Sequence, residues 1–454
     1  MSGYSMRLPA LLALPCLSCV MAGGKESVNW PSFRGEFASG VSEGPALPKK
    51  FSGETGEGLL FRTKVPGMGH SSPIVWGNKL FLTTAVSEDS GATFKPGLYG
   101  SGEASRDRSV HEWMVICLDK GTGKTIWKRI AKKGRPRDKR HVKATYANST
   151  PATDGERVVA FFGSEGLFAY TYEGELLWKK DLGRLDVGAY DLPSYEWGSA
   201  SSPIIHDGKV IVQCDTQKES FILALDARNG RTLWKTTRDE LPSWGTPTVV
   251  PGKVQTQVVT NGSNFIRGYD LGTGKEIWRL GGSSKITAPT PIFSKDLIVV
   301  ASGRAPERPI FAIRRSARGD ITLQAGKSKN ANVAWSHRKR GPYMPTPLLY
   351  GGKVYVLGNG GIFTIYELGS GKELSRGRIP HRAFGFSASP VATNGRIYLP
   401  GEDGLVFEME ADEETKLVAV HEMGEPLMAT PALSEGIMYL RGKQHLFAIG
   451  GGKQ

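Results

Sequence analysis

Eight Ser-Pro or Thr-Pro dipeptides divide most of this chain into segments of similar length and pattern. They stand at Ser72-Pro73, Thr150-Pro151, Ser202-Pro203, Thr246-Pro247, Thr290-Pro291, Thr346-Pro347, Ser389-Pro390 and Thr430-Pro431. Successive prolines are 41 to 56 residues apart, except for a first interval of 78. Proline is tolerated where a strand begins, because it removes no interior ladder hydrogen bond there. A period in this range predicts an array of repeated structural units.

One unit, residues 202–234, shows what each segment contains. Three short apolar runs are separated by Gly, Asp and Asn, and a fourth ends at Trp234. Runs of this length, rich in Val, Ile and aromatic residues, are typical of β-strands. Asp207-Gly208 and Asn229-Gly230 are hairpin signals, since these residues accept a positive φ at low cost. The unit is therefore predicted to be a four-stranded antiparallel meander.

The last strand of five units ends on a tryptophan at a shared offset from a turn: Trp127, Trp178, Trp234, Trp278 and Trp335. A shared offset indicates a structural role. We expect each indole to lie on an outer strand and to fill the gap between neighbouring units. Two later units lack this feature, with Ser375 at the expected position in the sixth.

The eighth unit runs out after three predicted strands, near residue 450. The missing strand is available near the other end, where residues 58–63 repeat the spacing from glycine to aromatic residue. Pairing these segments closes a ring and leaves no open sheet edge. The sequence thus predicts an all-β fold, an eight-bladed β-propeller of four-stranded antiparallel blades over residues 59–450, with the last blade closed by an N-terminal strand.

Four segments lie outside the repeat. Residues 1–22 have a basic residue, a short apolar run and small residues before Ala22, as in a cleaved signal peptide. Lipid attachment at Cys19 is the less favoured alternative. Residues 23–58 are expected to pack irregularly on the propeller, residues 85–112 form an insertion in the first blade, and residues 451–454 are a tail. We therefore expect export to the periplasm or cell envelope, and no transmembrane segment in the mature chain.

The formal charge of +14 comes in large part from residues 128–143. We expect this run to be a solvated loop, and export argues against a nucleic-acid partner. Outside the leader, only Cys117 and Cys214 remain, each within a predicted strand of a different unit. Two distant cysteines predict buried free thiols.

Residues just before each Ser/Thr-Pro pair are expected to converge on the propeller axis, where the innermost strands begin. The funnel candidates for ligand or cofactor binding are His70, Tyr146, Asn148, Trp197, Trp244, Tyr343 and Phe386, with Thr287, Met344, Phe384 and Met428 at equivalent positions. Apolar walls with a few polar groups suit a small-molecule pocket, and aromatic faces suit a sugar or a planar quinone. The alternative is that these side chains plug the channel as core. The histidines show no zinc-ligand spacing, and no metal site is predicted.

The pattern Ala224-Leu225-Asp226, Asn229-Gly230, Trp234 resembles the repeat of the pyrroloquinoline-quinone (PQQ) type propellers. Tyr269-Asp270, Thr273-Gly274, Trp278 repeats it, and Asn29-Trp30-Pro31-Ser32-Phe33-Arg34-Gly35 is similar to the opening of bacterial exported PQQ-like proteins. The resemblance covers nearly all of the mature chain. Its branches are quinoprotein alcohol dehydrogenases, the propeller lipoprotein of the outer-membrane barrel-assembly machine, and exported proteins without a settled activity.

These branches imply three functions. The first is an exported, non-catalytic and monomeric propeller that binds a small ligand or an envelope protein at its funnel. The second is a dehydrogenase using PQQ and Ca²⁺, for which Glu196 and Asp191 are the candidate catalytic carboxylates, with Asn148 as a neighbouring oxygen donor. The adjacent Cys-Cys pair of those enzymes is missing here. The third is a scaffold for outer-membrane protein assembly.

Overall fold

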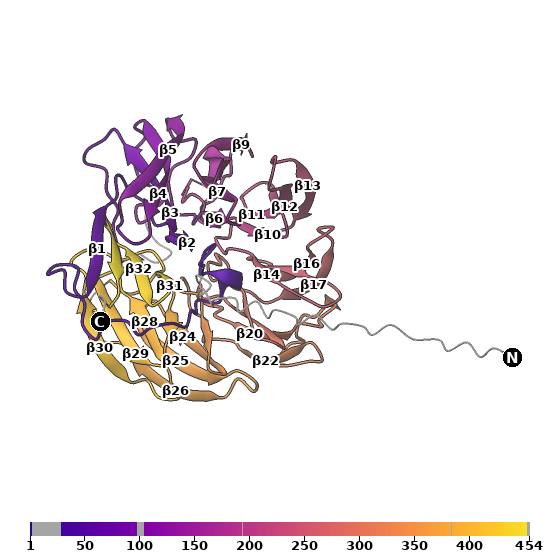
Figure 1. Cartoon of the computed structure of the whole chain (residues 1–454). Coiled ribbons are helices and arrows are strands. Elements are labelled where there is room, and N and C mark those ends of the chain that lie inside the picture. Colours follow the sequence, from indigo (N-terminus) through magenta and orange to yellow (C-terminus); the bar gives the residue numbers. More distant parts are fainter. Residues whose placement is uncertain (2–28, 98–103, 193, 383, 452–454) are drawn as a thin grey trace.

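The computed structural model describes residues 1, 29–97, 104–192, 194–382 and 384–451, and it is a ring of eight small sheets around a central axis (Figure 1). Each sheet is one blade, and its strands run antiparallel from the axis to the rim. This confirms the predicted all-β, eight-bladed propeller. No helix within these ranges is long and apolar enough to cross a bilayer.

The strands of blades 1 to 4 follow the chain. They are β2 (Ile74–Trp76), β3 (Lys79–Ser87), β4 (His111–Asp119) and β5 (Thr125–Gly134); β6 (Ala152–Thr153), β7 (Arg157–Phe161), β8 (Leu167–Thr171) and β9 (Leu176–Lys180); β10 (Ile204–His206), β11 (Lys209–Cys214), β12 (Ser220–Asp226) and β13 (Thr232–Arg238); β14 (Thr248–Val250), β15 (Gln257–Asn261), β16 (Phe265–Asp270) and β17 (Glu276–Gly281).

Blades 5 to 8 complete the ring. They are β18 (Ile292–Phe293), β19 (Leu297–Ala301), β20 (Ile310–Arg314) and β22 (Val333–His337); β23 (Leu348–Tyr350), β24 (Lys353–Leu357), β25 (Ile362–Glu367) and β26 (Glu373–Arg378); β27 (Val391–Thr393), β28 (Arg396–Pro400), β29 (Leu405–Glu410) and β30 (Leu417–Glu422); β31 (Ala432–Ser434), β32 (Ile437–Arg441), β33 (His445–Ile449) and β1 (Leu59–Lys64). Two short 3-10 turns, η1 (Glu36–Ala38) and η2 (Gly163–Glu165), and β21 (Gly319–Asp320), which pairs with β17, lie outside this pattern.

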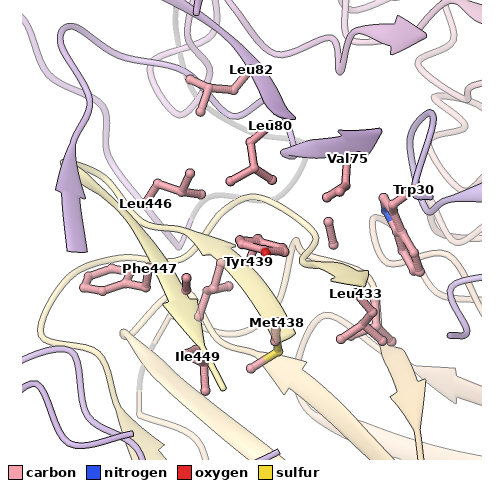
Figure 2. Close-up of a cluster of buried hydrophobic side chains, with 14 of the residues drawn as sticks. Trp30, Val75, Leu80, Leu82, Leu433, Met438, Tyr439, Leu446, Phe447 and Ile449 are labelled. Carbon is pink, nitrogen blue, oxygen red and sulfur yellow. The ribbon is translucent and has the colours of Figure 1, made fainter. Parts of the chain in front are cut away.

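Blade 8 joins the two ends of the chain, since β1 pairs antiparallel with β33 and forms its outer strand. Behind this joint, Leu80 and Leu82 of blade 1 pack with Tyr439 and Phe447 of blade 8 in one buried apolar cluster (Figure 2). The N-terminal strand thus closes the ring as predicted.

At the rim, the repeated tryptophan of one blade packs on a turn glycine of the next. The Trp178 indole donates a hydrogen bond to the carbonyl of Ala227 at 2.9 Å, and its ring lies against Gly230. Equivalent pairs are Trp127 with Gly174, Trp234 with Gly274, and Trp335 with Gly371. At the closing joint Phe61 of β1 takes the place of the indole against Gly123. The expected position of these indoles between blades is therefore confirmed. Trp278 also lies in a buried cluster with residues of blade 5, but its N–H donates to Gln257 of its own blade.

The segment before β1 runs across the inner strands of several blades. Trp30 pairs with Val75 of β2 in a short antiparallel bridge, and Gly40 accepts a hydrogen bond from Ala392 of β27. Arg34 is fully buried, and its guanidinium donates to the carbonyls of Ala38, Pro347 and Pro390. This segment therefore ties blades 1, 6 and 7 together beside the axis.

Candidate functional site

A cavity of about 220 Å³ lies on the propeller axis. All eight blades reach it, because its lining includes every serine or threonine of the Ser/Thr-Pro pairs: Ser72, Thr150, Ser202, Thr246, Thr290, Thr346, Ser389 and Thr430. Aromatic and apolar side chains form much of the remaining wall: Phe33, Trp197, Trp244, Ile286, Tyr343, Met344 and Met428. The polar wall groups include His70, His141, Lys143, Asn148 and Ser387.

Six of the eight hydroxyl side chains have a structural role that the sequence analysis missed. In six joints the hydroxyl of one blade accepts a hydrogen bond from the backbone N–H of the equivalent residue of the preceding blade, at 2.9 to 3.0 Å. We call this ring the axial belt. Each hydroxyl that accepts in this way keeps its own proton for donation, so the belt presents O–H groups beside the cavity.

Among the described residues the belt is open at two joints, from Thr246 to Thr290 and from Thr430 to Ser72, and the clearer case is Thr290. Its side chain is 1% exposed, and its Oγ1 has no hydrogen-bond partner among the described residues. Its backbone N–H still donates to Thr346 Oγ1 at 3.0 Å. Thr290 therefore holds its place in the ring although its buried hydroxyl is unpaired within the described part of the chain.

One side of the cavity carries a buried ion pair. The Lys143 ammonium lies 2.6 Å from Glu402 Oε1, and Glu402 is fully buried. Glu402 also accepts hydrogen bonds from Ser387 Oγ at 2.5 Å and from the Gly97 N–H at 2.7 Å. Burial lowers the pKa of Lys143, and the carboxylate of Glu402 opposes this shift. The pair fixes a cationic group in the wall and joins blade 7 to the segment after β5.

His70 lies beside this pair and is held in its neutral form. Its Nε2–H donates to the Lys143 carbonyl at 2.9 Å, and its ring meets Phe94 edge-on at 4.6 Å. Burial, together with the positive charges of Arg441, Lys143 and Arg140, lowers its pKa to about 3. Three cations therefore lie within electrostatic reach of one cavity-lining residue.

Two arginines near the axis have only neutral partners in the described ranges. Arg34 donates to three carbonyls, and Arg441 donates to the carbonyls of Ser71 and Thr83 and to Ser71 Oγ. Burial lowers the pKa of each to about 9, with no carboxylate to offset it. Glycines make room for them: a Cβ on Gly40 or Gly69 would collide with the guanidinium of Arg34 or Arg441.

The connection between β3 and β4 reaches over this polar side. Lys95 donates to the Val142 carbonyl, and the Thr93 carbonyl accepts from Arg140. Together with the Gly97 contact to Glu402, this places the loop against blade 7 and against the segment after β5. Its described part therefore packs against the residues that form the cationic side of the cavity.

The structure brings together five of the seven funnel candidates: His70, Asn148, Trp197, Trp244 and Tyr343 line the cavity, as do Met344 and Met428. The expected placement of Tyr146 and Phe386 is wrong. Tyr146 packs against His111 and Trp113, and Phe386 is fully buried against Phe407. Thr287 and Phe384 also lie outside the lining. A fixed offset failed because the segments before the first strands differ in length and path.

Neither candidate carboxylate lines the cavity. Glu196 accepts a hydrogen bond from the Lys139 N–H and pairs with Arg184 at 3.2 Å, and Asp191 is exposed. The interpretation of residues 128–143 as a solvated loop is also wrong. The first half of the run, up to Gly134, belongs to the outer strand β5, and Arg140, His141 and Lys143 near its end are buried. Cys117 and Cys214 are buried free thiols, as predicted.

The sequence analysis missed Lys143, Glu402 and the contribution of Phe33. Lys143 stood within a charge run, and Glu402 stood in a turn next to Asp403-Gly404. The pair is separated by 259 positions, so no local spacing could have revealed it. The axial belt had a signal in the sequence, because a serine or threonine precedes each of the eight prolines. The sequence analysis used only the proline, as a mark of where a strand begins, and gave the hydroxyl no role.

The eight four-stranded blades and their repeat place this protein in the class of PQQ-like propellers. The family model described as outer membrane protein assembly factor BamB matches residues 111–278 and 218–450. The chain therefore belongs to this family. No curated protein sequence matches it.

Solved structures with low sequence identity share the fold. BamB from Moraxella catarrhalis is 14% identical, with a TM-score of 0.53 over 87% of this chain and 99% of its own. A quinohemoprotein alcohol dehydrogenase from Comamonas testosteroni is 13% identical, with a TM-score of 0.60 over 94% and 81%. A europium-containing methanol dehydrogenase is 12% identical, with a TM-score of 0.60 over 94% and 90%.

Proposed function

We propose that this protein is an exported, non-catalytic propeller that binds a small ligand in its axial cavity. The observation that carries the proposal is the cavity itself, about 220 Å³ with aromatic walls and a few polar groups. Engineered cavities of about 150 Å³ hold a benzene molecule, so a molecule with one ring has room here. Trp197 and Trp244, with ring centroids 5.9 Å apart, offer faces for stacking.

The dehydrogenase alternative has less support from the residues present. Calcium takes six to eight oxygen ligands, usually with several carboxylates. In the described ranges no three His, Cys, Asp or Glu side chains gather as a metal site, and the one carboxylate beside the cavity, Glu402, is already paired with Lys143. The residues present therefore do not fit PQQ with Ca²⁺, and we derive no oxidation step.

Export is supported by the leader-like residues 1–22, of which residues 2–22 lie outside the described ranges. Mass spectrometry of the mature N-terminus tests it, and we expect cleavage after Ala22 with no lipid on Cys19.

The ligand proposal is tested by filling the cavity. Ala288 lines it, so Ala288→Phe places a ring in the space a ligand would occupy. We expect a panel of single-ring aromatic and sugar ligands to change the tryptophan fluorescence of the parent protein saturably, and this response to be lost in Ala288→Phe.

Ala331→Phe, in an exposed loop of blade 5, is the matched control and should respond as the parent does. Equal responses from Ala288→Phe and the parent would place the ligand elsewhere. Dye reduction by the protein with PQQ, Ca²⁺ and an alcohol would overturn the non-catalytic assignment.

A second candidate function rests on the family match. A member of this family could serve as a scaffold in outer-membrane protein assembly, using its blade surfaces and leaving the cavity unused. Co-purification from envelope extracts with a barrel-assembly component, retained by Ala288→Phe, would favour this candidate over the axial ligand.

A further inference from the structure

A second cavity, of about 240 Å³, lies at the opposite end of the inner strands from the axial cavity. Ser202 lines the axial cavity just before β10 begins, and His206 and Asp207 line the second cavity where β10 ends. Phe33 lines both cavities, so its side chain lies between them. The second cavity is therefore a separate space that an axial ligand would not occupy.

The walls of the second cavity come from the segment before β1 and from blades 1 to 4. Three aromatic side chains line it, Phe33 and Phe37 from the segment and Trp76 from the end of β2. Further apolar surface comes from the first strands of blades 3 and 4, at Ile204, Ile205 and Val249. A concave space with aromatic and apolar walls and a few polar groups is typical of a small-molecule site.

The turn η1 holds Phe37 in this wall against a backbone preference. Its φ is +54°, which is uncommon for a bulky side chain. The buried guanidinium of Arg34 fixes the turn by donating to the Ala38 carbonyl at 3.2 Å. The Phe37 ring packs against His206 and Phe293, with centroids 5.8 and 6.0 Å away. Strained backbone of this kind persists only where the surroundings fix it, and it is frequent at binding sites.

Two aromatic rings next to this wall already carry a cation of the protein itself. Arg315 lies over Phe293, which contacts Phe37, at 5.3 Å from the ring centroid. Lys79 lies over Tyr172 at 3.8 Å, and the Tyr172 hydroxyl donates to the backbone carbonyl of Trp76. Within the described part of the chain, no lysine or arginine lies over the three rings of the second cavity. These rings therefore have no cation of the protein to interact with, and a ligand could supply one.

The charges of the wall also favour a cation. The described lining includes three carboxylates and neither lysine nor arginine: the carboxylates are Glu36, Asp154 and Asp207. Asp154 and Asp207 each pair with a basic residue two or three positions further along the chain. Glu36 is exposed and forms no ion pair in the described ranges, so its charge is left to the cavity. Burial lowers the pKa of His206, so this lining residue adds no positive charge at pH 7.

We propose that the second cavity binds a small organic cation, an alkylated ammonium group that lies against Phe33, Phe37 and Trp76 with its charge facing Glu36. Aromatic faces attract such a group electrostatically, and quaternary ammonium ions are recognised in this way. The apolar surface takes the alkyl substituents, and the carboxylate compensates the charge. A neutral ligand of the same shape gains only the apolar contact.

The test is calorimetric titration of the full chain with choline and with its neutral carbon analogue, in which a tert-butyl group replaces the trimethylammonium group. We expect choline to bind at least about fivefold more tightly, because only the cation is attracted by the ring faces. Glu36→Gln should lower the affinity for choline about threefold and leave that for the analogue unchanged. Phe37→Leu keeps an apolar side chain but removes the ring, so it should reduce the preference for choline about threefold.

Two control variants lie outside the second cavity. Glu57→Gln removes an exposed carboxylate just before β1, and Ala288→Phe fills the axial cavity. Both should bind choline as the parent does. A loss in Glu57→Gln equal to that in Glu36→Gln would reduce the effect to general surface charge. A loss in Ala288→Phe would place the cation in the axial cavity, and either result would overturn the proposal.

The remaining outcomes concern the ligand. Equal affinities for choline and its analogue would overturn the selection of a cation, and no binding of choline would overturn the site. Neither result bears on the axial ligand, which the panel of aromatic and sugar ligands tests separately. Quaternary ammonium groups occur in free solutes and in lipid headgroups. Binding to phosphatidylcholine vesicles that Glu36→Gln weakens would assign a headgroup, whereas binding of choline without vesicle binding would assign a free solute.

Discussion

The rim and the axial belt join the same blades with the same repeat, yet they use different chemistry. At the rim, an indole of one blade rests on a turn glycine of the next, as Trp178 does on Gly230. At the axis, a hydroxyl of one blade accepts an N–H from another, as Thr346 does from Thr290. At the rim, the indole N–H groups donate to backbone carbonyls of the next blade, whereas the belt leaves the buried Thr290 hydroxyl without a partner among the described residues. The comparison teaches that one repeat can join its blades tightly at the rim and still line a cavity at the axis.

The largest loss of stability is expected from a substitution at the glycine of a rim joint. Gly230 has φ of +71°, and a Cβ there would lie 2.8 Å from the Trp178 ring. We expect Gly230→Ala to lower the free energy of unfolding by about 2–4 kcal/mol, through the strained backbone and the displaced indole. Chemical denaturation followed by tryptophan fluorescence measures this loss.

Gly208→Ala separates the two causes. Its φ is +67°, but no atom lies within 4 Å of the added Cβ. We expect a loss of about 1 kcal/mol from the backbone alone. Equal losses at both glycines would mean that the indole contact contributes nothing to the rim joint.

In the axial belt, the effect of a Thr→Val substitution on stability should depend on whether the lost hydroxyl accepts a hydrogen bond. Thr346→Val leaves the buried Thr290 N–H without its acceptor, and we expect a loss of about 1–3 kcal/mol in the free energy of unfolding. Thr290→Val removes a hydroxyl that has no partner in the described residues, so stability should stay the same or rise slightly. A larger loss for Thr290→Val than for Thr346→Val would contradict the interrupted belt.

A further effect concerns pH on the polar side of the cavity. The pKa of His70 is about 3 in the folded protein, against an ordinary value of 6.5. The unfolded chain therefore takes up this proton first, and stability falls as the pH drops below 6.5. The slope from His70 is at most about 1.4 kcal/mol per pH unit.

Replacing His70 with Gln keeps an N–H donor for the Lys143 carbonyl but removes the titration. We expect the melting temperature of His70→Gln to decrease less than that of the parent between pH 6.5 and 5. Parallel melting curves across this range would show that His70 takes up its proton in the folded protein.

Much of the fold could be predicted because the repeat carries a physical signal at each position. Alternating apolar runs defined strands, glycines with Asp or Asn defined turns, and the shared offset of the tryptophans placed them between blades. The closing strand was predictable because Phe61 keeps the spacing of its counterparts, and it does pack on Gly123.

The site was predictable only in part. His70, Asn148, Trp197, Trp244 and Tyr343 reach the cavity from repeat positions. Tyr146 and Phe386 do not, because the path of each irregular segment depends on what it packs against. The spacing of residues along the sequence therefore could not predict where these two side chains lie.

By itself, the sequence determined the number of blades, their antiparallel order and the joint between the two ends of the chain, since periodic backbone preferences are local. Only the tertiary structure decided which polar groups meet on the axis. Lys143 and Glu402 pair across the ring, and the Thr290 hydroxyl is left without a partner, because burial and charge pairing depend on distances between segments that are remote in the chain.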